Sequence, residues 1–173
     1  MVTPVFIRQS KPDDPVFGYG DIVRIYEEDN VVFECPGSTW PNAYRYSDKT
    51  PWGKVYAAIC CGVFPYLVTY RKRWGDCLLL NDGKAIPTIN SNTNHNGKKI
   101  ATEIFIHPGG VASKNPDNRG SRGCLTIPQS HYQAWISHFK TGQIGNVVVT
   151  EEHNFTMDAG GEIWVGQVVS RGN

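Results

Sequence analysis

Residues 103–110 read EIFIHPGG, and residues 121–126 read SRGCLT. The first stretch predicts a strand that carries His107 near its end, because β-branched and aromatic residues fill it. A loop rich in Asn, Asp, Pro and Gly follows, and the chain then turns through Gly123 into Cys124. The rest of the chain is organised around this strand, loop and turn.

Cys124 and His107 have the chemistry of a nucleophile and its base. Sulfur attacks as a thiolate, and a thiolate at neutral pH needs a base or a positive charge beside it. His107 can act as that base, and Arg122 adds positive charge. Gly123 allows a close approach of the backbone, so the amides of Gly123 and Cys124 can point at a developing oxyanion. The pattern therefore indicates acyl transfer.

A histidine and a cysteine at this spacing also have a simpler interpretation, as a surface imidazole and a buried packing thiol. However, the order of His107, a loop and Ser-Arg-Gly-Cys over residues 121–124 resembles the signature of the L,D-transpeptidase (YkuD-like) catalytic domain. Residues 22–39 are similar to that family's opening hairpin, and residues 50–56 to its Thr-Pro-x-Gly segment. With the helix and strand expected downstream, the resemblance covers roughly residues 20–150.

Two features depart from the family pattern. Thirteen residues separate His107 from Ser121, which is fewer than usual, and Thr126 stands where the family often has Asn or Arg. Both departures bear on the shape of the substrate pocket more than on the nucleophile.

The resemblance implies a mainly β fold, with two mixed sheets forming a sandwich or partly open barrel and one main α-helix after the catalytic cysteine. It implies a peptidoglycan-directed enzyme that cleaves the L,D bond of tetrapeptide stems through a thioester on Cys124, and that carbapenems acylate. His107 would act as base and then as acid, and Ser121 would orient His107 through its backbone carbonyl or its hydroxyl. Three residues would contact the substrate: Arg122, Gly109 and Gly110. No cofactor and no metal are expected.

The thioester has three possible fates, which are cross-linking to another stem, exchange with a free D-amino acid, and hydrolysis. The sequence does not choose among them. Two other functions fit the same residues: a cysteine peptidase or amidase of different specificity, and a non-catalytic wall-binding module. Release of D-alanine from tetrapeptide muropeptides separates the first from an L,D-transpeptidase. The intact Cys124, His107 and Gly123 argue against the second.

Composition indicates one globular domain. The chain has 173 residues, of which 40% are hydrophobic, and this is enough for a core. The formal net charge of +1 gives no electrostatic case for binding nucleic acid or a membrane surface. No apolar run approaches the length of a membrane span. We expect a loosely structured arm over residues 1–20 and one catalytic domain over residues 21–173, with the oligomeric state left open.

The N-terminus has no basic region followed by an apolar core, so the sequence shows no secretory signal peptide. Peptidoglycan lies outside the cytoplasm. We therefore expect the protein in the bacterial cell envelope, or exported by a non-standard route.

The chain has five cysteines and no C-x-x-C spacing. An odd number makes a poor disulfide framework, and the spacing gives no structural zinc site. We interpret all except Cys124 as packing thiols, typical of a reducing compartment. A disulfide from Cys35 to Cys77 or to Cys60 stays open.

Alternating apolar residues predict a hairpin over residues 22–39, with its turn at residues 28–30. Residues 55–70 predict one or two further strands, broken near Gly62 and Pro65.

Three polar segments follow. The basic run over residues 71–73 predicts a solvated turn that could meet an anionic substrate. Residues 81–83, Asn-Asp-Gly, predict a hairpin turn. Residues 90–99 predict a long polar loop with an exposed His95.

Four apolar residues at i, i+3, i+4 and i+7 predict a helix: Tyr132, Trp135, Ile136 and Phe139. Pro128 suits its first turn and Gly142 its end. We place His131 and His138 on the surface of this helix and do not interpret them as metal ligands. Two strands are predicted after the helix, over residues 146–150 and 161–169.

Overall fold

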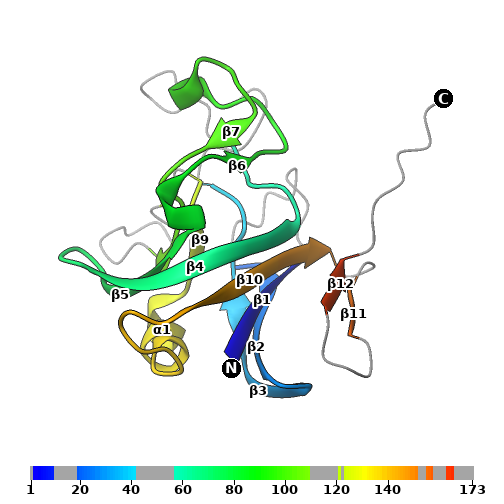
Figure 1. The fold of residues 1–173 in the computed structure, drawn as a ribbon, viewed down its shortest axis with the longest axis vertical. Coiled ribbons are helices and arrows are strands. Elements are labelled where there is room, and N and C mark those ends of the chain that lie inside the picture. The colour runs from blue at the N-terminus through cyan, green and yellow to red at the C-terminus, as the bar shows by residue number, and fades with distance from the viewer. Residues whose placement is uncertain are drawn as a thin grey trace.

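The computed structural model of the chain describes residues 2–9, 19–41, 57–109, 121, 123–151, 155–157 and 163–165. Figure 1 shows how its elements are arranged. In chain order they are β1 (Val2–Arg8), β2 (Asp21–Glu27), β3 (Asn30–Gly37), β4 (Gly62–Arg71), β5 (Gly75–Leu80), the 3-10 turn η1 (Asn81–Gly83), β6 (Ile86–Pro87), the 3-10 turn η2 (Thr93–His95), β7 (Ile100–Ala101), β8 (Phe105–Pro108), β9 (Leu125–Ile127), α1 (Gln129–Ile136), β10 (Ile144–Glu151), β11 (Phe155–Met157) and β12 (Ile163–Val165).

Eight strands form one mixed sheet in the order β3-β2-β1-β10-β4-β5-β8-β9. The pairs β1–β10 and β8–β9 are parallel, and the other neighbours are antiparallel. The outermost strands meet where Ser38 and Thr126 exchange backbone hydrogen bonds of 2.8 and 2.9 Å. The sheet is thus nearly closed into a barrel (Figure 1). Two small sheets are separate from it, one formed by β6 and β7 and the other by β11 and β12. The prediction of a mainly β chain with one main helix is confirmed.

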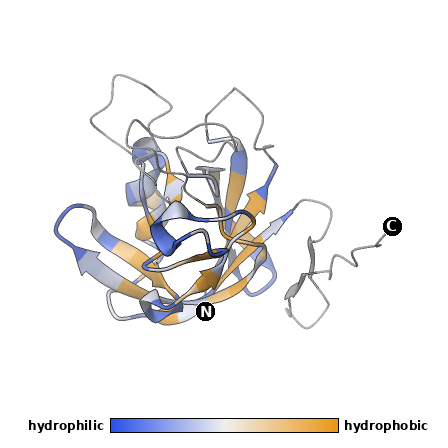
Figure 2. Ribbon diagram, turned by 90° about the horizontal axis from the view of Figure 1, so that it is seen from above, coloured by the Kyte–Doolittle hydropathy of each residue, from blue (hydrophilic) through white to orange (hydrophobic). Residues whose placement is uncertain are grey.

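The main hydrophobic core lies between the strands of this sheet and α1. Alternate strand residues enter it, such as Val23 and Ile25 of β2 and Ile106 of β8, and the helix adds Tyr132 and Trp135. Figure 2 shows apolar residues running along the strands and polar residues in the turns. Burying one such side chain fully stabilises the fold by about 1.5–3 kcal/mol, so this core fixes the strands that carry the site.

The expectation of a loose N-terminal arm is wrong for Val2–Arg8. These residues form β1, which lies between β2 and β10 inside the sheet. Phe6 enters the main core, while Val5 and Ile7 belong to a second buried cluster on the opposite face. A strand that is buried on both faces lacks the alternation of a half-exposed strand, so the pattern gives little local signal. Residues 10–18 lie outside the described residues.

The prediction of a hairpin at residues 81–83 is also wrong, although the turn itself is there. Asn81, Asp82 and Gly83 all have positive φ, at 49°, 52° and 71°, as an Asn-Asp-Gly turn favours. The chain does not fold back along β5, because β4 and β8 already occupy both edges of β5. It continues instead into β6, which belongs to another sheet.

The other element predictions are confirmed in outline. β2 and β3 form the expected hairpin, and β10 contains residues 146–150. β4 begins at Gly62 as expected but runs through Pro65, which pairs with Asn146. α1 begins after Pro128 and ends at Ile136, several residues before Gly142, so Gly142 is not the helix stop. β12 lies within the strand expected over residues 161–169, and the other residues of that range lie outside the described residues.

Candidate active site

The parallel strands β8 and β9 place His107 and Cys124 on one face of the sheet. Ile106 pairs with Leu125 and His107 with Thr126, and Cys124 directly precedes β9. Ile106 and Leu125 both enter the main core. Because successive side chains of a strand point to opposite faces, His107 and Cys124 project together from the other face, as diagonal neighbours.

The His107 ring is buried and held in one orientation. Only 1% of the residue is exposed, and the Trp74 ring stacks on it with centroids 4.0 Å apart and planes within 1°. Its Nδ1 lies 2.7 Å from the Pro108 carbonyl oxygen. A carbonyl can only accept, so Nδ1 carries the proton and Nε2 is left as the acceptor.

The pKa of His107 is lowered to about 4, mainly by burial and to a smaller extent by the charge of Arg73, against the opposing effect of the hydrogen bond to the Pro108 carbonyl. The imidazole is therefore neutral at pH 7. A neutral ring with an available Nε2 is the form that a general base requires.

The Cys124 thiol is partly exposed and weakly held. The Phe105 N–H donates to Sγ at 3.4 Å, and the thiol reaches the Glu103 carbonyl oxygen at 4.0 Å. Burial raises the pKa of Cys124 to about 11, with a smaller rise from the Glu103 charge, and the amides of Phe105 and Cys124 oppose this. The sulfur is therefore a protonated thiol at neutral pH.

Backbone strain lies directly beside this thiol. Glu103 has a φ of 52°, in the left-handed region that residues other than glycine seldom occupy. Its N–H is held by the Gly83 carbonyl oxygen at 3.1 Å. Strained residues gather at functional sites, where the surrounding structure maintains them.

In the part of the chain that the structure describes, no hydrogen bond joins the Cys124 thiol to the His107 ring. Contacts between catalytic groups are often long in ligand-free proteins and shorten only when substrate binds. The two groups therefore share a face of the sheet but do not form an ion pair at rest.

The Ser121 hydroxyl holds the turn before Cys124, and among the described residues no hydrogen bond joins it to His107. Its Oγ donates to the Cys124 carbonyl oxygen at 2.6 Å and accepts the Gly123 N–H at 3.1 Å. The expectation that Ser121 orients His107 is therefore corrected, because the Pro108 carbonyl does so. The expectation of a free Gly123 amide for the oxyanion is corrected too, since Ser121 occupies it.

Glycine is required at position 123. Its φ is 141°, and a Cβ there would lie 3.2 Å from the Ala57 carbonyl oxygen and 3.4 Å from Ile104 Cδ1. Both the backbone conformation and the close approach of Ala57 exclude a larger residue. The turn that presents Cys124 thus depends on Gly123, as its place in the motif predicts.

The expected substrate contacts fall into two groups. Arg122 and Gly110 lie outside the described residues. Gly109 is buried, its N–H donates to the Ile127 carbonyl oxygen at 2.8 Å, and a Cβ there would overlap the Tyr19 hydroxyl. The Tyr19 side chain therefore covers Gly109, so in this arrangement its role is close packing and it does not contact a substrate.

The site thus contains a neutral imidazole and a protonated thiol on adjacent strands. No family model matches this chain, and no curated protein matches it either. A proposal for the reaction must therefore rest on the chemistry of these two groups and on the sequence resemblance of the residues around them to the L,D-transpeptidase signature.

Sequence reasoning missed two residues that contact or adjoin His107. Trp74 stacks on its ring, and the position of Trp74 directly after the basic run is the one signal that could have indicated it. Thr126 pairs with His107 in register and is fully buried, and its hydroxyl has no hydrogen-bond partner among the described residues. Nothing in the sequence marks Thr126 apart from its departure from the family pattern.

Three other histidines lie within the described residues, and each has a contact of its own. His95 Nε2 is 3.4 Å from Thr102 Oγ1 in an exposed contact. His131 contacts Ser130, and His138 packs against Phe33. Among the described residues, no group of three or more His, Cys, Asp or Glu side chains could hold a metal ion, and no helix is long and apolar enough to cross a membrane.

All five cysteines are free thiols, so neither disulfide left open for Cys35 is formed. Burial raises the pKa of Cys35 to about 12 and that of Cys77 to about 11. Cys60 and Cys61 are partly exposed, and burial raises the pKa of both. The antiparallel register of β5 and β8 pairs Leu78 with Ile106, so Cys77 stands opposite His107, but unlike Cys124 it is fully buried.

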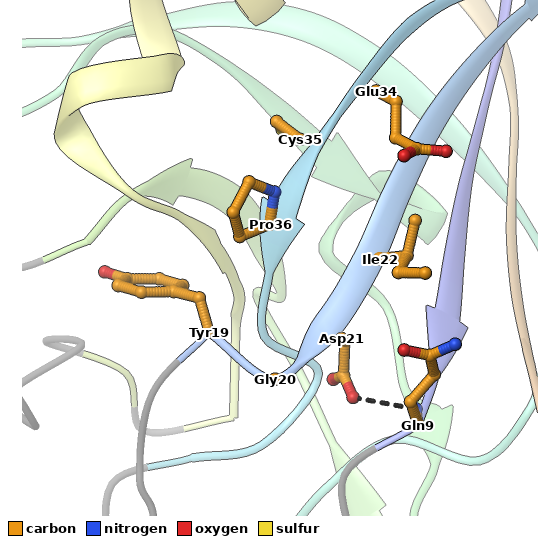
Figure 3. Close-up of a pocket in the computed structure, with 8 residues that line it drawn as sticks. All are labelled: Gln9, Tyr19, Gly20, Asp21, Ile22, Glu34, Cys35 and Pro36. Carbon is orange, nitrogen blue, oxygen red and sulfur yellow. Dashed lines mark hydrogen bonds between the residues drawn. The ribbon is translucent and has the colours of Figure 1, made fainter.

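Tyr19, whose hydroxyl covers Gly109, also lines a pocket of about 400 Å³. Figure 3 shows the hydrogen bond from the Gln9 N–H to Asp21 on its wall, at 3.1 Å. The pocket is formed by the end of β1 and by β2 and β3, with these residues lining it: Gln9, Tyr19, Gly20, Asp21, Ile22, Glu34, Cys35 and Pro36.

Proposed function

We propose that this chain is a cysteine acyltransferase of the L,D-transpeptidase type, which acts on the L,D bond of peptidoglycan tetrapeptide stems. The observation that carries the proposal is the placement of Cys124 and His107 on one face of adjacent parallel strands. The nearly closed β barrel with a helix after the cysteine agrees with the fold that the resemblance implies. Because peptidoglycan lies outside the cytoplasm, such an enzyme would work in the cell envelope.

The first half-reaction acylates the sulfur. As the Cys124 Sγ attacks the carbonyl carbon of the third stem residue, its proton passes to Nε2 of His107, and an S–C bond forms. His107 then gives this proton to the departing amine while the C–N bond breaks. The products are a thioester on Cys124 and the released D-amino acid.

Proton transfer is coupled to attack in this scheme, because both groups are neutral at rest. The pKa of Cys124 is raised and that of His107 is lowered by burial, so a thiolate–imidazolium pair is disfavoured before substrate binds. With the Gly123 N–H held by Ser121, the Cys124 N–H is the amide of this turn that would stabilise the oxyanion.

The second half-reaction returns the sulfur to a thiol. An amine of another stem, a free D-amino acid or water attacks the thioester, with His107 accepting the proton of the nucleophile and returning it to the sulfur. Cross-linking, exchange and hydrolysis differ only in this acceptor.

Incubation with purified disaccharide-tetrapeptides, followed by mass analysis, tests enzyme, substrate and reaction type together. The expected result is loss of the terminal D-alanine, with the acceptor identified from the mass of the second product. Cys124→Ala should form no product, and His107→Ala should be slower by roughly a hundredfold or more. Cys61→Ala is the matched control and should keep its activity. Turnover by Cys124→Ala would refute the assignment, and cleavage of ordinary L,L-peptides alone would favour a cysteine peptidase.

A further inference from the structure

The end of β4 and the turn into β5 carry three adjacent cations, Arg71, Lys72 and Arg73, which we call the basic rim. All three are exposed. In the described part of the chain none of them is within ion-pair distance of a carboxylate, whereas Arg24 pairs with Glu34 and Lys84 with Asp82. The rim is therefore a concentration of uncompensated positive charge on a protein whose formal net charge is only +1.

Aromatic side chains lie between the basic rim and the candidate active site and contact both. Trp74, the next residue, stacks on His107 at 4.0 Å. The Arg71 guanidinium lies over the Phe105 ring at 4.9 Å from its centroid, and that of Arg73 lies 5.9 Å from the Trp74 centroid. Phe105 also donates its N–H to the Cys124 sulfur. The two arginines thus lie over the face of the sheet that carries the thiol and the imidazole.

The charge of Arg73 is close enough to the imidazole to lower the pKa of His107. A negatively charged group that approaches His107 on the side of Trp74 therefore meets positive charge. Arginine is suited to such a group, because its planar guanidinium can donate two parallel hydrogen bonds to one carboxylate.

We propose that the basic rim binds the free α-carboxylate of the departing C-terminal residue, and so selects donors that end at that residue. The inference rests on the proposed function. In that reaction the departing amine takes its proton from His107. The carboxylate carbon of a C-terminal residue lies two bonds, about 2.5 Å, from that nitrogen. When the departing residue is the C-terminal residue of the substrate, proton transfer from His107 to its amine therefore brings its carboxylate next to His107 and Trp74.

The first arm of the test measures charge selectivity at Cys124 without any peptidoglycan. Wild-type protein is alkylated with iodoacetate, which is anionic, and with iodoacetamide, its neutral counterpart, and peptide mapping follows modification of Cys124. The ratio of the two rate constants cancels changes in thiol reactivity. In Arg71→Gln/Arg73→Gln, the rate constant for iodoacetate divided by that for iodoacetamide should fall about fivefold at low ionic strength.

Two variants control this arm. Arg71→Lys/Arg73→Lys keeps the charge and should keep most of the ratio. Lys98→Gln/Lys99→Gln removes the same charge from the segment before β7, which lies away from β5 in Figure 1, and should leave the ratio unchanged. A ratio that is unchanged in the Arg→Gln variant, or equally reduced in the Lys98/Lys99 control, overturns the inference.

The second arm compares a tetrapeptide with a free C-terminal acid against its C-terminal amide. We expect kcat/KM to favour the acid, and the Arg71→Gln/Arg73→Gln variant to lose most of that preference. Equal turnover of acid and amide by the wild type overturns the inference and leaves the proposed function intact. If neither peptide is processed while the alkylation ratio falls as expected, the proposed function fails, and the rim stands as an anion site beside Cys124.

Discussion

Two regions of this molecule bury polar side chains, and these side chains form many hydrogen bonds in one region and few in the other. At the end of β1, the Arg8 guanidinium donates to Thr39 Oγ1 at 2.8 Å and to the Ile59 carbonyl oxygen at 2.9 Å, and it reaches Cys61 Sγ at 3.8 Å. Asp21 accepts from both the amide and the hydroxyl of Thr39 at 2.7 Å. Arg8, Asp21 and Thr39 each have at least two hydrogen-bond partners in this network.

The face of β8 and β9 is different. Within the described ranges, His107 makes one hydrogen bond through Nδ1, the Cys124 sulfur has one long donor, and the Thr126 hydroxyl has no partner. A buried polar group without a partner costs free energy, so such groups persist where they serve a ligand or a reaction. The comparison teaches that the Arg8 network holds the fold together, whereas the His107 face keeps its polar groups available.

The largest expected contrast between the regions is in thiol reactivity. A carbapenem should acylate Cys124, as the family resemblance implies, and intact-mass spectrometry should show a single adduct. The adduct should vanish in Cys124→Ala and persist in Cys61→Ala, because Cys61 packs against Arg8 and has no base beside it. An adduct that survives in Cys124→Ala would place the reactive residue elsewhere.

Breaking the Arg8 network should have the largest effect on stability. Arg8→Met removes donors to two buried oxygen atoms, and we expect the free energy of unfolding to fall by roughly 3 kcal/mol or more. Urea unfolding measures it. Arg24→Met is the matched control, because Arg24 pairs with Glu34 at the surface, and it should cost less than about 1 kcal/mol. Equal losses in the two variants would contradict the comparison.

Acid should destabilise the protein through His107. Burial, with a contribution from Arg73, lowers the pKa of this residue from 6.5 to about 4. As the pH falls through 6.5 the unfolded chain takes up a proton on this histidine, and the folded chain does not until about pH 4. The stabilisation is therefore complete above pH 6.5 and is lost as the pH falls toward 4, by roughly 3 kcal/mol in all.

This pH dependence can be assigned by substitution. The free energy of unfolding, followed in urea between pH 4 and pH 7, should vary less steeply in His107→Gln, since glutamine does not titrate. His95→Gln serves as the control, because the His95 ring makes an exposed contact with Thr102, and its profile should match the wild type. A His107→Gln profile as steep as the wild type would assign the acid sensitivity to other groups.

The smallest expected effect concerns two threonines. Thr126→Val replaces an unpartnered buried hydroxyl with a methyl group of similar shape, so the free energy of unfolding should stay the same or rise by up to about 1 kcal/mol. Thr39→Val removes a hydroxyl that is bound to Arg8 and Asp21, and should cost about 1–3 kcal/mol. A loss in Thr126→Val as large as in Thr39→Val would show that the Thr126 hydroxyl has a partner in solution.

Much of the local structure could be predicted from the sequence. The alternation of Val23 and Ile25 indicated the β2–β3 hairpin, and the spacing of Tyr132 and Trp135 indicated α1. The strand that carries His107 was marked by its apolar residues. These predictions were correct because each depends on residues that are close along the chain.

The predictions that were wrong depended on distant partners. β1 is a central strand because β10, near the other end of the described chain, pairs with it. The turn at residues 81–83 does not make a hairpin because both edges of β5 are occupied. Local sequence cannot report which strand edges are already paired.

The sequence by itself determined which chemical groups the site contains: a thiol, an imidazole and a turn that needs glycine at position 123. The protonation and the orientation of these groups depend on the tertiary structure. It stacked Trp74 on His107, used Ser121 for the turn, and brought an unpaired basic rim over the same face. The physical reason is that protonation and orientation depend on burial and on neighbours from other strands, and these come together only when the sheet has formed.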